Sequence, residues 1–553
     1  AQAATYAMAA GTVDNADINL LLNKDNTLSM FSTEGAEQPK IKAIMAYDLA
    51  VTPMEDNGGY TFSFVSNADA VNGEIIFYDS ESGEELGSYT LSGIVEGENS
   101  VDIINAELPG EKGQVMTWAV ALEGEAIGTI TNLNEYSEYA YNAAYLAIDK
   151  SPESEHFGQV YVADRAGTAN TPQHGIYVYD PTWTRMNETP YQGGAGFISN
   201  YRMGIDETGK LYIPEWSDPN SGVFVADPSN LEGQFTQFFE GERTSSGLFT
   251  NNGVEVGGSS TCATVFGTGE NARLYVHSED QSYNGSTNNI AIYNIGSSDG
   301  LASTWGEAPS AFIGIGGLLI NGNVNVVVTD ENGVWASQVR SNGNNTSGVP
   351  SLIYAKNDGT VLFNSGANDF APYLNGSGGG GFAISNDGSM LVINDASSTF
   401  QFYDVTWDGE TPTLTPKYSY KHSINNSGGN TYQLAFDYAG NLLATGGYFG
   451  VFSIPTDDNS TVVPAKKAMT VIKGESGVAN NVVNVAAAKI YPNPTTGIIN
   501  IETTENIVSI KVYNTTGALV LESSETTIDL GDLASGLYFV KVNDMESVKI
   551  IKK

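Results

Sequence analysis

Polar residues able to bind a cation or another ligand follow a series of apolar segments in the middle of the chain. Each such segment is the second strand of a recurring unit, so equivalent positions in successive units meet around one axis. Converging carboxylates repel each other unless a cation or hydrogen-bond donors separate them, and Ca²⁺ or another hard divalent cation prefers such oxygen ligands. The candidate ligand-binding residues are Asp164, Arg165, Glu215, Trp216, Glu279, Gln338, Asn394, Asp395 and Tyr448.

The unit that positions these residues recurs between about residues 140 and 475. It contains an apolar strand, a turn with Asp or Asn and Gly, a second apolar strand, a polar loop and a third strand. The segment 203–213, with Asp206 and Gly209 in its turn, is the clearest copy. The Asp is expected to cap the turn and the Gly to supply a positive φ, so both are interpreted as structural. The unit occurs six times, which predicts a six-bladed β-propeller over residues 140–475.

This series of strands resembles the NHL and gluconolactonase-like group of six-bladed propellers. The resemblance is one of architecture. It implies a divalent ion at the mouth of the central channel, because relatives that hydrolyse lactones hold such an ion with Glu, Asn and Asp side chains. Glu215, Asn394 and Asp395 match those ligands by blade position, although no family motif surrounds them.

The regions on either side of the repeats also have the pattern of β-structure. Residues 40–135 alternate in the manner of a fibronectin- or immunoglobulin-like β-sandwich, with Trp118 directed inward. Residues 1–39 form an N-terminal segment that can add a hairpin to either neighbour, and residues 476–487 are a linker. The predicted fold class is all-β: a β-sandwich, the propeller and a small C-terminal β-sandwich over residues 488–553.

Residues 488–553 carry the most specific motifs of the chain. The residues that carry the motifs are Tyr491, Pro492, Asn493, Pro494, Gly497, Gly517, Gly536 and Tyr538. In this order and spacing they resemble the type A C-terminal sorting domain of the type IX secretion system of the Bacteroidetes. The resemblance implies secretion or display at the cell surface, with components of the secretion translocon and its shuttle as partners. A signal peptide is inferred to have been removed, because the chain begins without a basic and apolar leader.

Composition excludes several classes of partner. The chain has 64 acidic and 24 basic residues, a net charge of −40, and a field of that sign repels nucleic acid and anionic lipid. No apolar run is long enough to predict a transmembrane segment. Cys262 is the single cysteine, which leaves no intramolecular disulfide, and its flanks predict a buried position in a strand.

Two classes of function remain open. The sequence has no Gly-x-Ser-x-Gly elbow, no HExxH pair and no phosphate-binding loop. We therefore favour a surface protein that binds a glycan, peptide or protein partner. This interpretation is based on the missing catalytic signature, the several β-modules and the acidity of the chain. The alternative is a metal-dependent hydrolase or lyase that acts at the propeller mouth, so whether the chain is an enzyme stays open.

Overall fold

The structure is a computed structural model of the 553-residue chain. It describes three strands within residues 8–32 and then residues 43–553, except for 55–57, 126–129, 134–142, 165–173, 195–199, 297–307, 316, 320–323, 339–349, 366–380, 395–397, 423, 425–432, 455–460, 475–488, 504–506, 515–517 and 544–547. Apart from two short 3₁₀ turns, η1 (Pro228–Asn230) and η2 (Gly269–Asn271), every regular element described is a strand. The all-β prediction is confirmed.

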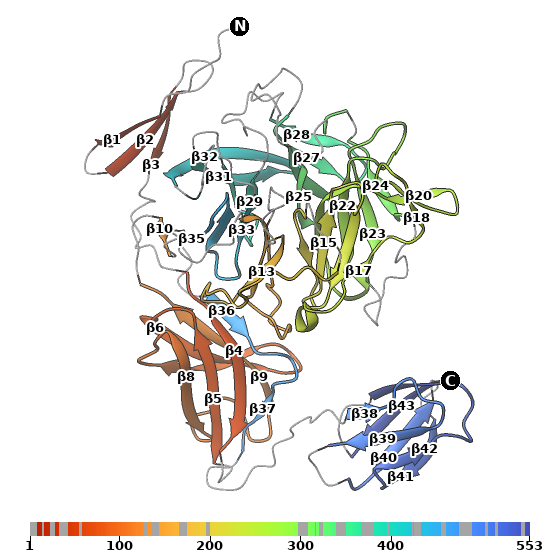
Figure 1. Cartoon of the computed structure of the whole chain (residues 1–553). Helices are drawn as coiled ribbons and strands as arrows, with labels where there is room; N and C mark the ends of the chain where they lie inside the picture. The colour runs from red at the N-terminus through yellow and green to blue at the C-terminus, as the bar shows by residue number, and fades with distance from the viewer. Residues whose placement is uncertain are drawn as a thin grey trace.

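Six antiparallel sheets form a β-propeller, as the repeats predict (Figure 1). The first three blades are β11 (Ala143–Ile148), β12 (Val160–Asp164) and β13 (Gly175–Tyr179); β14 (Gly204–Ile205), β15 (Leu211–Glu215), β16 (Gly222–Ala226) and β17 (Thr236–Gln237); and β21 (Ser260–Phe266), β22 (Arg273–Ser278), β23 (Asn289–Asn294) and β24 (Ala311–Ile313). The last three are β25 (Val324–Asp330), β26 (Gly333–Gln338), β27 (Leu352–Lys356) and β28 (Val361–Asn364); β29 (Phe382–Ile384), β30 (Met390–Asn394), β31 (Thr399–Asp408) and β32 (Thr411–Lys421); and β33 (Gln433–Phe436), β34 (Leu442–Thr445), β35 (Phe449–Ser453) and β10 (Thr131–Asn132).

The ring of blades closes through a strand from the other end of the propeller sequence. The innermost strands β11, β14, β21, β25, β29 and β33 each contact the next, and β33 contacts β11. The outer strand of the sixth blade is β10, which precedes the first blade in sequence and pairs Thr131 with Ser453 of β35. The innermost strands enclose a channel of about 240 Å³, lined by residues such as Leu146, Met203, Val326 and Leu434.

The turns between first and second strands explain why the repeat carries Asp and Gly. Asp206 Oδ1 accepts hydrogen bonds from the backbone N–H groups of Thr208 (2.9 Å) and Lys210 (3.1 Å), and Gly209 has a φ of 87°. The sixth blade uses the same geometry at Asp437, as predicted. Gly333 of the fourth blade does not adopt a positive φ. A Cβ there would lie 2.5 Å from the carbonyl oxygen of Ala355, so close strand packing requires the glycine.

The N-terminal β-sandwich has two antiparallel sheets around one core. One sheet contains β4 (Ala46–Pro53), β5 (Gly59–Ser66) and β8 (Gly97–Ile104). The other contains β7 (Glu85–Leu91), β6 (Asn72–Asp79), β9 (Val115–Glu123), β36 (Thr461–Pro464) and β37 (Val471–Ile472). Trp118 is buried between the sheets as predicted, with its ring 4.9 Å from that of Phe62 in an edge-to-face arrangement.

The propeller is inserted into this sandwich. Strands β36 and β37 follow the last blade in sequence, yet both pair with β9, Thr461 opposite Leu122 and Val471 opposite Met116. Figure 1 shows them in blue beside the orange strands of the sandwich. Residues 461–472 therefore pair with the sandwich, although the sequence placed them within the propeller range of 140–475.

The sandwich and the propeller share a packed contact. Asn441, in the first turn of the sixth blade, donates a side-chain hydrogen bond of 3.1 Å to the carbonyl oxygen of Ala43. The Tyr438 hydroxyl donates one of 3.0 Å to the carbonyl oxygen of Val462, and its ring lies 5.0 Å from that of Phe157 in the first blade. The sandwich thus covers the rim of the propeller where first strands end and second strands begin.

Four further sheets complete the described fold. Residues 8–32 form a sheet of their own from β1 (Met8–Val13), β2 (Ala16–Leu22) and β3 (Leu28–Ser32). A small sheet between the second and third blades consists of β18 (Glu242–Arg243), β19 (Phe249–Asn251) and β20 (Val254–Gly257). The C-terminal sandwich pairs β38 (Lys489–Tyr491), β39 (Ile498–Glu502) and β42 (Thr527–Asp529) in one sheet, and β41 (Leu519–Ser523), β40 (Ile510–Asn514), β43 (Gly536–Val542) and β44 (Val548–Lys552) in the other.

The C-terminal sandwich has its own hydrophobic core, formed by residues such as Ile499, Val512 and Val540. Two of the predicted motif residues fix its loops. Asn493 Nδ2 donates to the carbonyl oxygen of Lys549 at 2.8 Å, and the Tyr538 hydroxyl donates to that of Ala534 at 2.8 Å. Gly517 and the predicted linker 476–487 lie outside the described residues.

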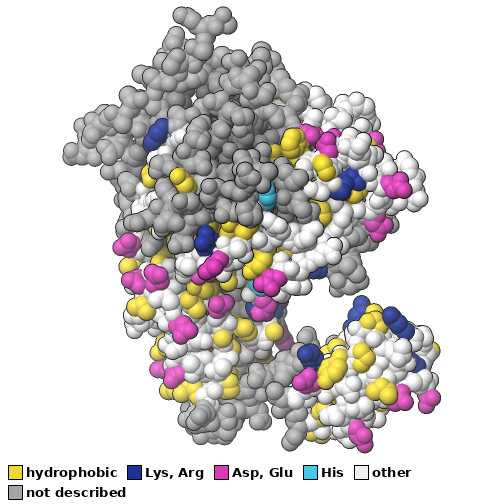
Figure 2. Space-filling view, viewed as in Figure 1, with side chains coloured by type: hydrophobic (Ala, Val, Ile, Leu, Met, Phe, Trp, Pro, Cys, Tyr) yellow, Lys and Arg dark blue, Asp and Glu magenta, His cyan; other side chains and the backbone are white. Residues whose placement is uncertain are grey.

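The surface agrees with the composition. In the view of Figure 2, Asp and Glu side chains are scattered over the visible face instead of forming one patch. Within the described residues, no helix has the length and apolarity needed to cross a membrane.

Candidate functional site

The second strands of the blades end at one rim of the propeller with buried polar residues. Because neighbouring strands are antiparallel, the end of each second strand lies at the same rim as the start of the innermost strand. This rim, here termed the mouth, is opposite the rim that the sandwich covers. Asp164, Glu215, Gln338 and Asn394 stand there, and at most 6% of each residue's surface is exposed.

Three of the predicted mouth residues are engaged by their own neighbours. Glu215 Oε1 accepts hydrogen bonds from the N–H (2.9 Å) and hydroxyl (2.5 Å) of Ser217. The amide nitrogen of Gln338 donates to the carbonyl oxygens of Leu318 (2.6 Å) and Pro350 (2.9 Å). Asn394 Oδ1 lies 2.6 Å from His422 Nε2. These bonds hold the loops of single blades together.

The remaining predicted residues differ in burial. Asp164 is fully buried at the end of β12, and Tyr448 is half-buried with its backbone N–H bonded to the carbonyl oxygen of Ile424 at 3.2 Å. Arg165 and Asp395 lie outside the described residues.

Asp395, one of the three predicted ligands of a divalent ion, lies outside the described residues. Glu215 ends a strand of the second blade and Asn394 one of the fifth, and these blades face each other across the axis of the ring. The Asn394 amide oxygen also faces His422. No group of three or more His, Cys, Asp or Glu that could hold a metal occurs in the described part of the chain. The assignment to Glu215, Asn394 and Asp395 stays a prediction.

Two predicted residues, Trp216 and Glu279, do come together, where the second and third blades meet. Ser259, just before β21, connects the carboxylates beside them. Its N–H donates to Asp280 Oδ2 at 3.0 Å, its carbonyl oxygen accepts from the Glu279 N–H at 3.1 Å, and its hydroxyl lies 3.5 Å from Asp218 Oδ1. We term Trp216, Asp218, Glu279 and Asp280 the Trp216 corner.

The corner combines an aromatic surface with acceptors for hydrogen bonds. Asp218 is exposed, and Trp216, Glu279 and Asp280 are half-buried. Burial raises the pKa of Glu279, the negative charges of Asp280 and Asp218 raise it further, and the indole N–H of Trp216 opposes the rise. Such a corner suits a ligand that presents a ring face and hydroxyl groups, and Glu279 is the carboxyl group best suited to hold a proton.

Trp216 packs against a stack of side chains formed by Tyr201, Tyr145 and Arg202. The Trp216 ring lies 6.1 Å from Tyr201, which stacks on Tyr145 at 4.8 Å. The guanidinium of Arg202 lies 4.8 Å from the Tyr145 ring, and it donates to the carbonyl oxygen of Val324 at 3.2 Å. Arg202 is 1% exposed, so this buried stack holds the Trp216 ring in position.

A buried histidine lies near this stack. His277 of β22 is fully buried, and its Nδ1 lies 2.7 Å from the hydroxyl oxygen of Thr261. Burial lowers the pKa of His277 to about 3, and the positive charge of Arg202 contributes in the same direction. His277 is therefore neutral at physiological pH.

Sequence reasoning missed Asp218, Asp280 and Ser259. Asp280 directly follows a predicted residue, and Asp218 follows Trp216 by two positions, so a wider window after each second strand includes both. Ser259 precedes a first strand, and nothing in the repeat marks it. Cys262, predicted to be buried in a strand, is 1% exposed within β21, and burial raises the pKa of its thiol.

Comparison with protein families gives one match. Residues 489–553 match the model of the secretion system C-terminal sorting domain. This segment is a type IX sorting domain, as its motifs predicted, and such a domain implies export to the cell surface or secretion. No curated protein matches the chain.

Solved structures similar to the chain include propellers of different kinds. A Bacteroides thetaiotaomicron protein of unknown function is 12% identical, with 76% of this chain and 100% of that one covered and a TM-score of 0.36. A Xanthomonas campestris gluconolactonase is 12% identical, with 61% and 90% covered and a TM-score of 0.34. The C-terminal WD40 domain of Sif2 is also 12% identical, with 81% and 93% covered and a TM-score of 0.29.

Proposed function

We propose that this chain is a binding protein, exported through the outer membrane by the type IX secretion system, that holds a glycan at the propeller mouth. The observation that carries the proposal is the Trp216 corner, where an indole ring stands beside three carboxylates. A sugar presents an apolar ring face for the indole and hydroxyl donors for the carboxylates, and both sets of contacts fit one ligand.

The supports of the corner favour a preformed site. Trp216 rests on Tyr201 and, through it, on the buried pair of Tyr145 and Arg202. Asp280 is held by the Ser259 backbone. A site whose side chains are already positioned loses little conformational entropy when the ligand binds.

The test is a screen of the full chain against a glycan array, followed by calorimetric titration of the best oligosaccharide. Trp216→Ala should weaken binding about tenfold or more, because a central aromatic contact carries much of the binding energy at such sites. Trp407→Ala is the control: Trp407 is more exposed (42%) than the half-buried Trp216, and it lies near the far end of β31, away from the mouth. Equal affinity of wild type and Trp216→Ala would contradict the proposal. If the chain binds a peptide or protein and no glycan, a peptide or protein replaces the glycan as the proposed ligand.

A hydrolase or lyase at the mouth is the second candidate, and the raised pKa of Glu279 favours it. A carboxyl group that keeps its proton nearer to neutral pH can act as a general acid. The array hits provide the substrates to assay, with and without added Ca²⁺. Loss of turnover with retained binding in Glu279→Gln would establish catalysis. Binding without turnover in the wild type would contradict the enzyme and leave the binding protein as the proposed function.

A further inference from the structure

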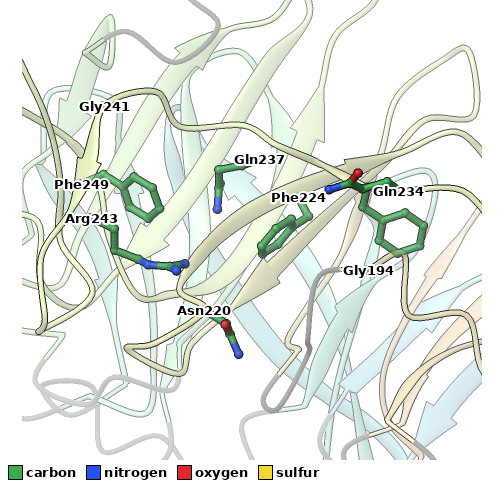
Figure 3. Close-up of a pocket in the computed structure, with 9 residues that line it drawn as sticks. Gly194, Asn220, Phe224, Gln234, Gln237, Gly241, Arg243 and Phe249 are labelled. Atoms are coloured by element: carbon green, nitrogen blue, oxygen red, sulfur yellow. The ribbon is translucent and has the colours of Figure 1, made fainter.

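A second cavity lies beside the Trp216 corner, between the outer strands of the second blade and the small sheet β18–β20. It encloses about 370 Å³, within the range of about 300–1,000 Å³ typical of small-molecule sites. Phe224 of β16 and Phe249 of β19 supply apolar surface, and both are at least 90% buried. Asn220, Gln234, Gln237 and Arg243 supply the polar part of the lining. In Figure 3 the guanidinium of Arg243 and the amide of Gln237 point toward the space beside Phe224.

Arg243 gives the pocket a positive charge that nothing described neutralises. Its side chain is exposed, its Nη1 donates to the carbonyl oxygen of Ser221 at 3.3 Å, and its guanidinium lies 5.7 Å from the Phe249 ring. No acidic residue lines the pocket, and among the described residues none forms an ion pair with Arg243. In a chain of 64 acidic and 24 basic residues, such a pocket selects for an anionic ligand.

The hydrogen bonds around Ser221 hold the two donors in place. The Ser221 carbonyl oxygen accepts from Gln237 Nε2 (3.2 Å) as well as from Arg243. Gln237 Oε1 in turn accepts from the N–H of Val223 (3.2 Å), which fixes the amide. Ser221 is fully buried, and its hydroxyl donates to the carbonyl oxygen of Gly247 (2.7 Å) in the turn after β18. The guanidinium keeps most of its N–H groups for a ligand.

The rim of the pocket adds a group suited to hydroxyls and a glycine at a close approach of two backbone segments. Gln234 is exposed and makes no hydrogen bond with a described residue, so its amide is available as donor and acceptor. Gly241 lines the pocket without a side chain. It has a φ of 95°, and a Cβ there would lie 2.2 Å from the carbonyl oxygen of Thr250, so only glycine fits.

We propose that this pocket binds a sugar that carries a carboxylate, a uronic acid unit. The carboxylate pairs with the fork of N–H groups on Arg243, the apolar face of the ring lies on Phe224, and the hydroxyls bond to Gln234. A glycan unit fits this lining better than a peptide, because the pocket offers amide groups and no carboxylate for a peptide's ammonium group. The residues that line this pocket are different from those of the Trp216 corner, although Gly247, which accepts from Ser221, lies next to Ser259 and Asp280. The inference does not depend on the function of the mouth.

The test uses two sugars that differ at one carbon. Galacturonate carries a carboxylate where galactose carries a hydroxymethyl group, and their dissociation constants for the full chain can be measured by NMR titration. Galacturonate should bind about tenfold more tightly than galactose, and Arg243→Gln should remove this difference. Arg185→Gln is the matched control, because Arg185 also stands over an aromatic ring (Tyr177, 5.6 Å) but does not line the pocket.

The inference would be overturned by equal affinities for the two sugars or by unchanged galacturonate binding in Arg243→Gln. Displacement of galacturonate by an equal concentration of sodium sulfate would also overturn it, because it would mark a simple anion site. Trp216→Ala separates the two proposals. Galacturonate binding that survives this substitution belongs to the pocket, whereas binding lost with it belongs to the mouth and contradicts the pocket assignment.

Discussion

At the scale of single residues, the site follows partly from local rules. The positions after second strands contain Trp216 and Glu279 because the repeat places those residues at one rim. Ser259 and Asp218 meet only because neighbouring blades approach at a particular distance and angle, and no local pattern encodes this. The partnership of Asn394 with His422, across the outer strands of the fifth blade, is of the same kind.

His277 gives the first prediction at this scale. Its pKa is lowered from 6.5 to about 3 in the folded chain, so below pH 6.5 the unfolded chain binds a proton that the folded chain does not. Stability is therefore unaffected above pH 6.5 and falls as the pH decreases toward 3, by about 1.4 kcal/mol per pH unit. His277→Gln removes this titration. Between pH 7.5 and 5 it should lose about 2 kcal/mol less stability than the wild type.

Urea unfolding followed by Trp fluorescence at several pH values measures this difference. The values at pH 7.5 provide the internal control, because any packing cost of the substitution is already present there. Parallel pH dependences of the wild type and His277→Gln would show that His277 titrates normally and contradict the prediction.

At the scale of elements, part of the fold follows from local sequence patterns, and part depends on pairing between distant segments. Turns such as 206–209 and the strands beside them can be read from short patterns of apolar residues, Asp and Gly. The pairing of β36 with β9 joins residues more than 300 positions apart in sequence, and β10 joins β35 in the same way. Alternation of apolar and polar residues predicts a strand but not the strand with which it pairs. Residues 461–472 were therefore predicted to belong to the propeller.

Tyr60 tests how the returning segment stabilises the sandwich. Its buried hydroxyl donates to the carbonyl oxygen of Ile472 and accepts from the Ile472 N–H, both at 3.0 Å. Tyr60→Phe leaves both backbone groups without this partner and should lower the free energy of unfolding of the sandwich by about 1–3 kcal/mol. Urea denaturation followed by circular dichroism measures the change.

Tyr89→Phe is the control for this substitution. Tyr89 is a half-buried residue of the same sandwich whose hydroxyl makes no hydrogen bond with a described residue, so its loss should cost less than about 0.5 kcal/mol. Equal effects of the two substitutions would mean that the bonds to Ile472 add nothing to stability.

At the scale of the whole molecule, the chain combines a body with a separately folded C-terminal domain. The body consists of the sandwich and the propeller inserted into it, whose ends are joined by the pairing of β36 and β37 with β9. The core of the C-terminal sandwich contains only residues between 490 and 550. The whole chain has a net charge of −40, so its molecules repel one another, and Figure 2 shows acidic side chains scattered over the visible face.

Deletion of residues 489–553 is the prediction that belongs to this scale. Because no described residue of the body's cores comes from that segment, the truncated protein should still fold and unfold cooperatively, with the far-ultraviolet spectrum of a β-protein. It should no longer reach the cell surface or the medium, because the sorting domain is absent. Immunoblots of periplasm, surface and medium from the source bacterium measure its distribution. Attaching residues 489–553 to an unrelated periplasmic β-protein provides the reciprocal control, since the domain should direct that cargo outward. Truncated protein found at the cell surface would show that the body carries its own export signal.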